Sequence, residues 1–303
     1  MKKTYYSNGK LLLTGEYVVL DGALALALPT KFGQDLIVET SDSKEIHWTS
    51  YDADGSIWFE DTFLYSEIEN KISFSEQPVK NTLIEILHEA GLLNPSFLKH
   101  NEGFRISTHL TFPKFWGLGT SSTLINNIAQ WLEIDAFALL KNSFGGSGYD
   151  IACAQNDTPI LYCLDSGKPL VKSVAFVPEC RNHLYFVYLN QKQNSKSAIA
   201  SYQQKRTALD NIILQTDKIT TALLQTNDGL RFQLLLQEHE HILSALLELP
   251  TVKENLFPDF QGSVKSLGAW GGDFILAYSK ENPTSYFHEK GFQIVIPYAD
   301  MIL

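Results

Sequence analysis

Cysteine is scarce in this sequence. The 303 residues include three cysteines, Cys153, Cys163 and Cys180, and no Cys-x-x-Cys pair. An odd number of widely spaced cysteines argues against a disulfide framework. We therefore expect thiols that act as small apolar side chains in a reducing compartment.

The sequence also lacks an excess of positive charge and long apolar runs. The formal net charge is −10, whereas binding to nucleic-acid phosphates needs clustered lysine and arginine. The apolar stretch over residues 22–29 is far too short to cross a bilayer, and residues 1–6 lack the apolar core of a signal peptide. The sequence predicts a soluble, cytoplasmic protein with no nucleic-acid or membrane partner.

The composition is that of a globular protein, with 44% hydrophobic and 19% charged residues. At ~150 residues per domain, the length favours two domains. The first 110 residues contain short apolar or alternating runs, which predict strands over 11–13, 17–20, 24–28, 36–39, 46–49 and 104–108. One helix is predicted over 78–90, with Gly91 as its stop.

The middle and the end of the chain mix helices and strands. Helices are predicted after Gly119, over 135–141 and through most of 197–249. Strands are predicted over 183–189, 264–269, 274–278 and 292–296. Because there is no regular βαβ rhythm, we expect the α+β class in two domains, 1–180 and 181–303.

A glycine-rich segment leads into one of these helices. It runs from Pro113 to Ser122 and contains Gly117-Leu118-Gly119-Thr120-Ser121. Glycines let the backbone approach a ligand closely, and the first amides of a helix favour an anion. The alternative is a glycine turn followed by an ordinary Ser/Thr cap.

Two further segments carry charged residues beside glycine. Lys10 follows Gly9 at the head of an apolar strand, where it is either a surface charge or a cation for a reacting phosphate. Asp150 follows Ser147-Gly148-Tyr149, where it is either a helix cap or a carboxylate that orients a substrate hydroxyl.

In this order, the segments resemble the GHMP kinases, the family of galacto-, homoserine, mevalonate and phosphomevalonate kinases. Residues 9–22 are similar to the family's first motif, residues 113–122 to its phosphate-binding motif, and residues 147–150 to the segment with its catalytic aspartate. Residues 265–273 resemble its carboxy-terminal glycine motif. Ser195 follows a strand where relatives carry a Ser/Thr loop that faces the substrate.

The resemblance implies a ribosomal-protein-S5-like amino-terminal domain that binds ATP and a ferredoxin-like carboxy-terminal domain. It implies that Asp150 and Lys10 are catalytic and that Ser121 ligates Mg²⁺. The phosphates of ATP would contact Pro113, Gly117, Leu118, Gly119, Thr120, Ser121 and Ser122. The small-molecule substrate would contact Glu16, Ser147, Gly148, Tyr149, Ser195, Gly268, Ala269, Gly271 and Gly272.

The sequence departs from the family in two places that bear on the substrate. Trp270 stands in the last glycine motif where relatives have glycine, and its ring is expected to narrow the site or cover the substrate. Residues 136–144 lack the acidic residue with which mevalonate kinases bind magnesium. This second departure favours phosphomevalonate over mevalonate as the acceptor.

Two other functions stay open beside the kinase. One is an ATP-dependent decarboxylase like the diphosphomevalonate decarboxylases of the same superfamily, and the other is a regulator that binds a nucleotide or metabolite without turnover. The run Glu238-His239-Glu240-His241 has no metal-ligand spacing and is interpreted as a solvated helix face. The chain is expected to be a monomer or a homodimer.

Overall fold

The computed structural model describes residues 1–99, 102–191, 195–204 and 209–303. The chain forms two compact units. Unit 1 comprises Met1–Gly9, Phe32–Lys114 and Leu118–Gln155, and unit 2 comprises Lys10–Lys31, Phe115–Gly117 and Asn156–Leu303. The long strands β1 (Lys2–Thr14) and β2 (Ala25–Ser41) supply residues to both units. The division into domains near residue 180 stays a prediction.

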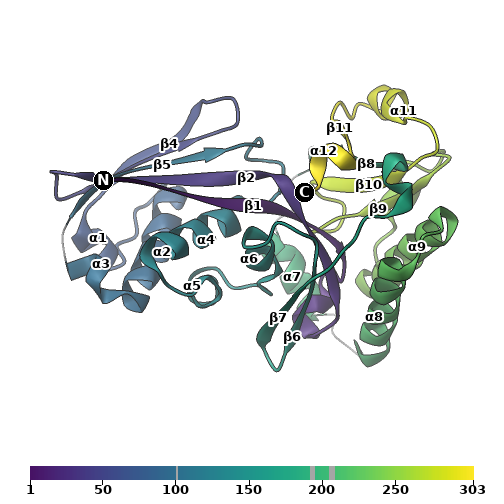
Figure 1. Cartoon of the computed structure of the whole chain (residues 1–303), viewed down its shortest axis with the longest axis horizontal. Coiled ribbons are helices and arrows are strands. Elements are labelled where there is room, and N and C mark those ends of the chain that lie inside the picture. Colours follow the sequence, from purple (N-terminus) through teal and green to yellow (C-terminus); the bar gives the residue numbers. More distant parts are fainter. Residues whose placement is uncertain (100–101, 192–194, 205–208) are drawn as a thin grey trace. The chain divides into compact units, whose positions relative to one another are not determined.

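Unit 1 is built on a sheet whose strands follow the order β4 (Ile57–Phe63), β3 (Ile46–Tyr51), β5 (Gly103–Leu110), β2, with β1 beside β2. Figure 1 labels β4, β5, β2 and β1 of this sheet. β5 pairs antiparallel with β2 and parallel with β3. The register places Ile106 between Val38 and Trp48, and all three are buried. Alternate residues of these strands therefore form one apolar face, as the period of two in the sequence predicts.

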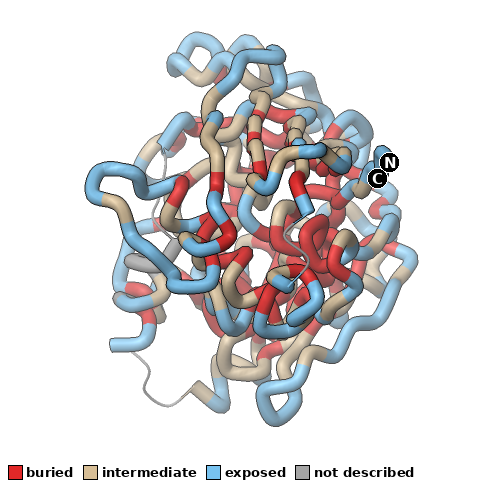
Figure 2. The backbone as a smooth tube through the Cα atoms, turned by 90° about the vertical axis from the view of Figure 1, so that its left-hand side faces the viewer, coloured by how far each residue is buried: buried red, intermediate tan, exposed pale blue. Residues whose placement is uncertain are grey.

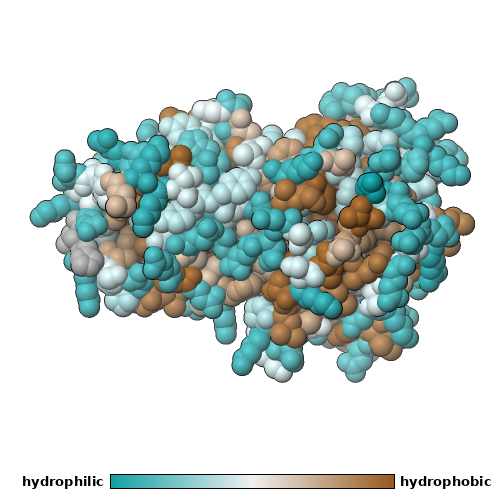
Figure 3. All heavy atoms as spheres, viewed as in Figure 1, coloured by the Kyte–Doolittle hydropathy of each residue, from teal (hydrophilic) through white to brown (hydrophobic). Residues whose placement is uncertain are grey.

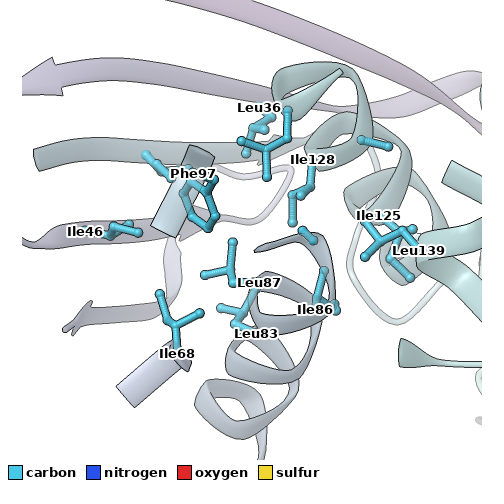
Figure 4. Packing of buried hydrophobic residues seen from close by; sticks show 14 of the residues in the cluster. Leu36, Ile46, Ile68, Leu83, Ile86, Leu87, Phe97, Ile125, Ile128 and Leu139 are labelled. Atoms are coloured by element: carbon cyan, nitrogen blue, oxygen red, sulfur yellow. The ribbon is translucent and has the colours of Figure 1, made fainter. Parts of the chain in front are cut away.

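Helices of unit 1 pack in a common apolar core with this face of the sheet. They are α1 (Tyr65–Glu69), α2 (Pro78–Leu93), α3 (Pro95–Lys99), α4 (Thr120–Leu132), α5 (Ala136–Ser143) and α6 (Tyr149–Ala154). Figure 4 shows Leu83 and Leu87 of α2 near Ile68 of α1, and Ile125 of α4 near Leu139 of α5. Burial of each such side chain contributes roughly 2 kcal/mol to folding.

Unit 2 contains the hairpin of β6 (Ile160–Asp165) and β7 (Lys168–Ser173), in which β6 also pairs with the start of β2. Its second sheet is antiparallel and has the order β11 (Val295–Pro297), β8 (Leu184–Tyr188), β10 (Phe274–Tyr278), β9 (Ser263–Ser266). The helices of this unit are η1 (Val18–Asp21), η2 (Glu179–His183), α7 (Ser195–Gln204), α8 (Leu209–Gln225), α9 (Gly229–Leu247), α10 (Val252–Leu256), α11 (Thr284–Glu289) and α12 (Tyr298–Met301). The α+β class with two sheets is confirmed.

Two local predictions are wrong. Residues 17–20 were expected to form a strand, but they enter the short 3₁₀ helix η1, because Gly15, Tyr17 and Gly22 all have positive φ and turn the chain back. Gly91 does not stop its helix, since α2 continues to Leu93. A Cβ on Gly91 would lie 2.5 Å from Leu98 Cδ1, so this glycine permits close packing instead.

Buried residues occupy the interior and exposed residues the periphery of the fold (Figure 2). On the face of unit 2 seen in Figure 3, hydrophobic residues are visible among hydrophilic ones. Among the described residues, no helix has the length and apolar character needed to cross a membrane.

Candidate active site

The predicted phosphate loop has the backbone that its glycines suggest. Gly117 and Gly119 have φ values of 69° and 101°, in the left-handed region that favours glycine. Leu118 between them is fully buried and anchors the turn. α4 starts directly afterwards at Thr120 and has no acidic residue in its first turn. The first amides of a 13-residue helix therefore follow a tight loop, an arrangement suited to an anion.

The hydroxyls at this helix start differ in exposure. Ser121 is exposed, and Thr120 is half-buried. Ser122 is only 3% exposed, and its hydroxyl donates to Gly119 O at 2.9 Å. Ser122 thus connects the helix start to the loop, whereas Ser121 is exposed to solvent. Pro113, at the head of the segment, is exposed.

In unit 2, two charged side chains meet the first glycine of this loop. Lys10 Nζ donates to Gly117 O at 2.9 Å. A Cβ on Gly117 would lie 1.8 Å from Asp273 Oδ2, so the carboxylate packs directly against the glycine. Lys10 is therefore at the loop, as the sequence predicts. Asp273 was not predicted as a site residue, although it ends the last glycine motif.

Aromatic rings support the residues just before Gly117. The Trp116 ring lies 5.5 Å from that of Phe274, edge to face, and 6.1 Å from that of Tyr188. The Tyr188 hydroxyl also donates to Phe115 O at 3.1 Å. Side chains from β8 and β10 thereby hold the segment that enters the phosphate loop.

Asp150 lies in the first turn of α6, after Gly148, whose φ is 90°. Its Oδ1 accepts from the amide of Ile151 at 3.0 Å. α6 packs against α4, and Gln155 Nε2 donates to Asn126 Oδ1 at 3.0 Å between them. Unit 1 therefore holds the candidate catalytic aspartate and the candidate phosphate helix in two adjacent helices.

The neighbours of Asp150 in the predicted substrate segment are partly or fully buried. Ser147 and Tyr149 are half-buried, and Gly148 is buried. Ser195 is the first residue of α7, and its side chain lies outside the described structure.

The carboxy-terminal glycine segment forms an open turn. Gly268 and Gly271 have φ values of 70° and 69°, and a Cβ on either would meet no atom within 4 Å. Gly272 N–H donates to Ala269 O at 2.9 Å and closes the turn. The backbone of this segment thus remains accessible on the side of Gly268 and Gly271.

The sequence suggested that the Trp270 ring narrows the site or covers the substrate, but in the structure the ring packs against other parts of unit 2. The Trp270 amide donates to the Tyr17 hydroxyl at 2.7 Å, and the indole Nε1 donates to Pro250 O at 3.1 Å. The ring packs in a hydrophobic cluster with Tyr17, Tyr202 and Leu247. The large side chain is therefore accommodated within the helical layer of unit 2.

Glu16 is buried, and the run 238–241 has two buried and two exposed residues. Glu16 is 3% exposed, and its Oε1 accepts from Lys265 Nζ at 2.6 Å. Its contact with a substrate stays a prediction. The interpretation of 238–241 as a solvated helix face is wrong for His239 and Glu240, which are 0% and 2% exposed. Within the described ranges, no group of histidine, cysteine and acidic residues has the arrangement of a metal site.

No family model and no curated protein sequence matches this chain. Solved structures do match over nearly its full length. Mevalonate kinase from Methanococcus jannaschii is 15% identical, with a TM-score of 0.66 over 97% of this chain and 96% of that one. Phosphomevalonate kinase from Streptococcus pneumoniae, in complex with phosphomevalonate and AMPPNP, is 18% identical, with a TM-score of 0.69 over 99% and 98%.

Galactokinase from Lactococcus lactis, complexed with galactose, is 13% identical, with a TM-score of 0.66 over 95% of this chain and 88% of that one. All three are small-molecule kinases of the family that the sequence motifs resemble. Identities this low establish similarity of fold rather than of substrate. The chain therefore has the two-sheet α+β fold of the GHMP kinases.

Proposed function

We propose that the protein transfers a phosphoryl group from ATP to a small-molecule alcohol or phosphomonoester. The single observation that carries this proposal is the loop at Gly117–Gly119, which opens onto the start of α4 and has Lys10 at the Gly117 carbonyl. A tight glycine turn followed by the free amides of a helix favours a polyphosphate. The Lys10 ammonium group, at the first glycine of the loop, adds a positive charge there.

The residues present fit ATP with Mg²⁺. The amides from Gly119 to Ser122 would bind phosphate oxygens, and no acidic side chain in the first turn of α4 opposes them. Ser121 is exposed, and its hydroxyl is a suitable oxygen ligand for Mg²⁺. When bound, ATP supplies the γ-phosphoryl group and Mg²⁺ offsets its charge.

The protein's own residues have separate tasks in this proposal. Asp150 orients the acceptor hydroxyl and takes its proton as the oxygen attacks phosphorus. Lys10 stabilises the negative charge on the transferred group. Phosphoryl transfer depends mainly on positioning and electrostatic stabilisation, so a small set of residues is sufficient.

Phosphomevalonate is the acceptor that we favour, followed by mevalonate. α5 contains no acidic residue where mevalonate kinases carry a magnesium ligand, and phosphomevalonate kinase is among the structural neighbours. Galactokinase and a D-glycero-D-manno-heptose 1-phosphate kinase are neighbours as well, so sugars belong in the test. An S5-like and a ferredoxin-like domain and a cytoplasmic location complete the proposal.

The test is ADP release from ATP and Mg²⁺ with mevalonate, phosphomevalonate, diphosphomevalonate, galactose, heptose 1-phosphate or homoserine. Turnover with one acceptor, with the phosphorylated product identified, would establish the reaction. Asp150→Asn should reduce this turnover by about 10²-fold or more and leave ATP affinity nearly unchanged. Near-normal turnover in Asp150→Asn would remove this residue from the mechanism.

The same assay separates the two alternatives. Carbon dioxide released from diphosphomevalonate would indicate a decarboxylase, and ATP binding without turnover on any acceptor would indicate a regulator. Two features motivated a regulator, Trp270 in the last glycine motif and the missing acidic residue in 136–144. The packing of the Trp270 ring with Tyr17 and Leu247 weakens the first of them.

A further inference from the structure

Four ionisable side chains lie together in the interior of unit 2. Glu16 follows β1, His239 and Glu240 belong to α9, and Lys265 lies in β9. Each is at most 3% exposed. Lys265 Nζ lies 2.6 Å from Glu16 Oε1 and 3.7 Å from Glu240 Oε2, and His239 Nε2 lies 3.6 Å from Glu16 Oε2.

The cluster holds two carboxylates but a single ammonium group. Burial keeps the pKa of His239 well below its usual value, so the imidazole is neutral. Burial also raises the pKa of Glu16 to about 7, against the opposing effect of Lys265. Glu16 Oε2 and His239 Nδ1 are buried without a hydrogen-bond partner. The cluster is therefore close to a state in which Glu16 carries a proton.

Stability alone does not account for such a cluster. Desolvation of buried ions offsets most of their mutual attraction, and well-packed apolar residues of similar volume are often equally stable. Buried ionic groups can instead fix one arrangement of the chain, because each charge accepts few geometries. The backbone groups that this cluster binds show which arrangement it fixes.

Two of the glycine segments are tied to the cluster. The Gly15 amide donates to His239 Nε2 at 3.0 Å, directly after the strand that carries Lys10. Lys265 Nζ donates to Ser266 O at 2.8 Å, and the Ser266 amide and hydroxyl donate to Glu240. Ser266 ends β9, two residues before Gly268, and β9 packs against α9 (Figure 1). The cluster thus fixes the Gly15 turn and the base of the 268–272 turn against the same helix.

We propose that Lys265 is a positioning residue that holds the 268–272 turn in place for the phosphoryl acceptor, through its buried contacts with Glu16, Glu240 and Ser266. This inference rests on the proposed kinase function. Lys265 itself is 1% exposed, so it acts through the backbone that follows it and not by direct contact with the acceptor.

The main test is the double variant Lys265→Met/Glu240→Gln. Methionine keeps the unbranched length of lysine, and the introduced glutamine retains an oxygen for the Ser266 amide. The variant removes the ammonium and one carboxylate, and Glu16 can take up a proton, so no unpaired charge remains buried. We expect a melting temperature close to that of the wild type. We expect the KM for the acceptor to rise by about tenfold or more, with the KM for ATP within about twofold.

Lys253→Met is the matched control. Lys253 Nζ also donates to a backbone carbonyl in unit 2, that of Gly262 at 2.6 Å, but it lies outside the cluster. We expect unchanged KM values in this variant. Wild-type KM values in the double variant would overturn the proposal. A lower melting temperature together with a lower kcat and higher KM values for both substrates would overturn it as well, because that pattern indicates a purely structural role.

Hydrogen exchange tests the positioning role without any turnover. In the double variant, amides of residues 267–273 should exchange about tenfold faster than in the wild type, and those of β8 should be unchanged. Equal protection of 267–273 in both proteins would refute the inference. A wild-type chain that transfers no phosphoryl group would defeat the proposed function. The hydrogen-exchange result would then still show whether Lys265 holds the 268–272 turn in place.

Discussion

At the scale of single residues, Gly117 is a position in the phosphate loop that has no room for a side chain. Its φ is positive, and the space that a side chain would occupy is taken by Asp273 Oδ2. The sequence motif predicts the glycine. It does not predict the carboxylate, because Gly117 and Asp273 lie far apart in the sequence and meet only in the fold.

Gly117→Ala should destabilise the protein by roughly 2 to 5 kcal/mol, from backbone strain and overpacking together. Gly291→Ala is the matched control in the same unit, since Gly291 also has positive φ but no atom within 4 Å of an added Cβ. This control should cost roughly 1 to 2 kcal/mol. Urea unfolding of both variants measures the difference. Equal losses in the free energy of unfolding would show that the Asp273 side chain moves aside at little cost.

Glu16 gives unit 2 a dependence on pH. Because burial raises its folded pKa to about 7 from 4.5, its contribution to stability is fully present below about pH 4.5 and is lost as the pH rises through about 7. The stability of the wild type relative to Glu16→Gln should therefore fall by about 2 kcal/mol between about pH 5 and pH 8. Urea unfolding of both proteins at the two pH values measures this.

Glu254→Gln provides a comparison of opposite sign. Hydrogen bonds from Thr251 lower the pKa of Glu254, so the wild type should gain stability relative to this variant as the pH rises from strongly acid values. A wild type that gains relative to Glu16→Gln as well would contradict the prediction for Glu16.

At the scale of elements, the start of α4 separates two serines that the sequence treats alike. Ser122→Ala should reduce the free energy of unfolding by about 1 kcal/mol, because it removes a buried hydrogen bond to Gly119 O. Ser121→Ala should leave stability unchanged and weaken the Mg²⁺ dependence of nucleotide binding. Thermal unfolding and nucleotide titration with and without Mg²⁺ distinguish them, and the reverse pattern would exchange their roles.

Several elements with strong apolar spacing were predicted, and β7, whose pattern is weak, was missed. α4, β5 and β8 have clear apolar spacing and were expected in the right places. β7 has almost no buried residue, so its sequence contains no alternation to detect. The buried side of α9 at His239 and Glu240 was missed for a related reason, since ionisable residues are normally exposed. Their partners, Glu16 for His239 and Lys265 for Glu240, are distant along the chain.

At the scale of the whole molecule, each compact unit is assembled from segments that are separate in the sequence. Three segments make up each unit, so neither unit is continuous in the sequence. The motifs predicted the overall fold class and the loop at Gly117. They could not predict which unit each motif joins, because β1 and β2 serve both.

A fragment of residues 156–303 should therefore not fold alone, although it contains most of unit 2. It lacks the start of β2 that pairs with β6, and it lacks Glu16, the partner of buried Lys265. Circular dichroism should show no cooperative melting transition. Joining residues 10–31 to the fragment through a flexible linker should restore much of the transition, and a cooperative transition in the unlinked fragment would contradict this view.

Trp270 gives the carboxy-terminal turn an optical label of its own. The indole is half-buried and donates to Pro250 O, so its emission depends on whether the turn stays docked on the helices. The chain has five tryptophans, and replacing Trp48, Trp58, Trp116 and Trp131 by phenylalanine would leave this one as the sole fluorophore. The residue that departs most from the family motif would then report in real time, by its emission wavelength, any movement of the turn when substrate arrives.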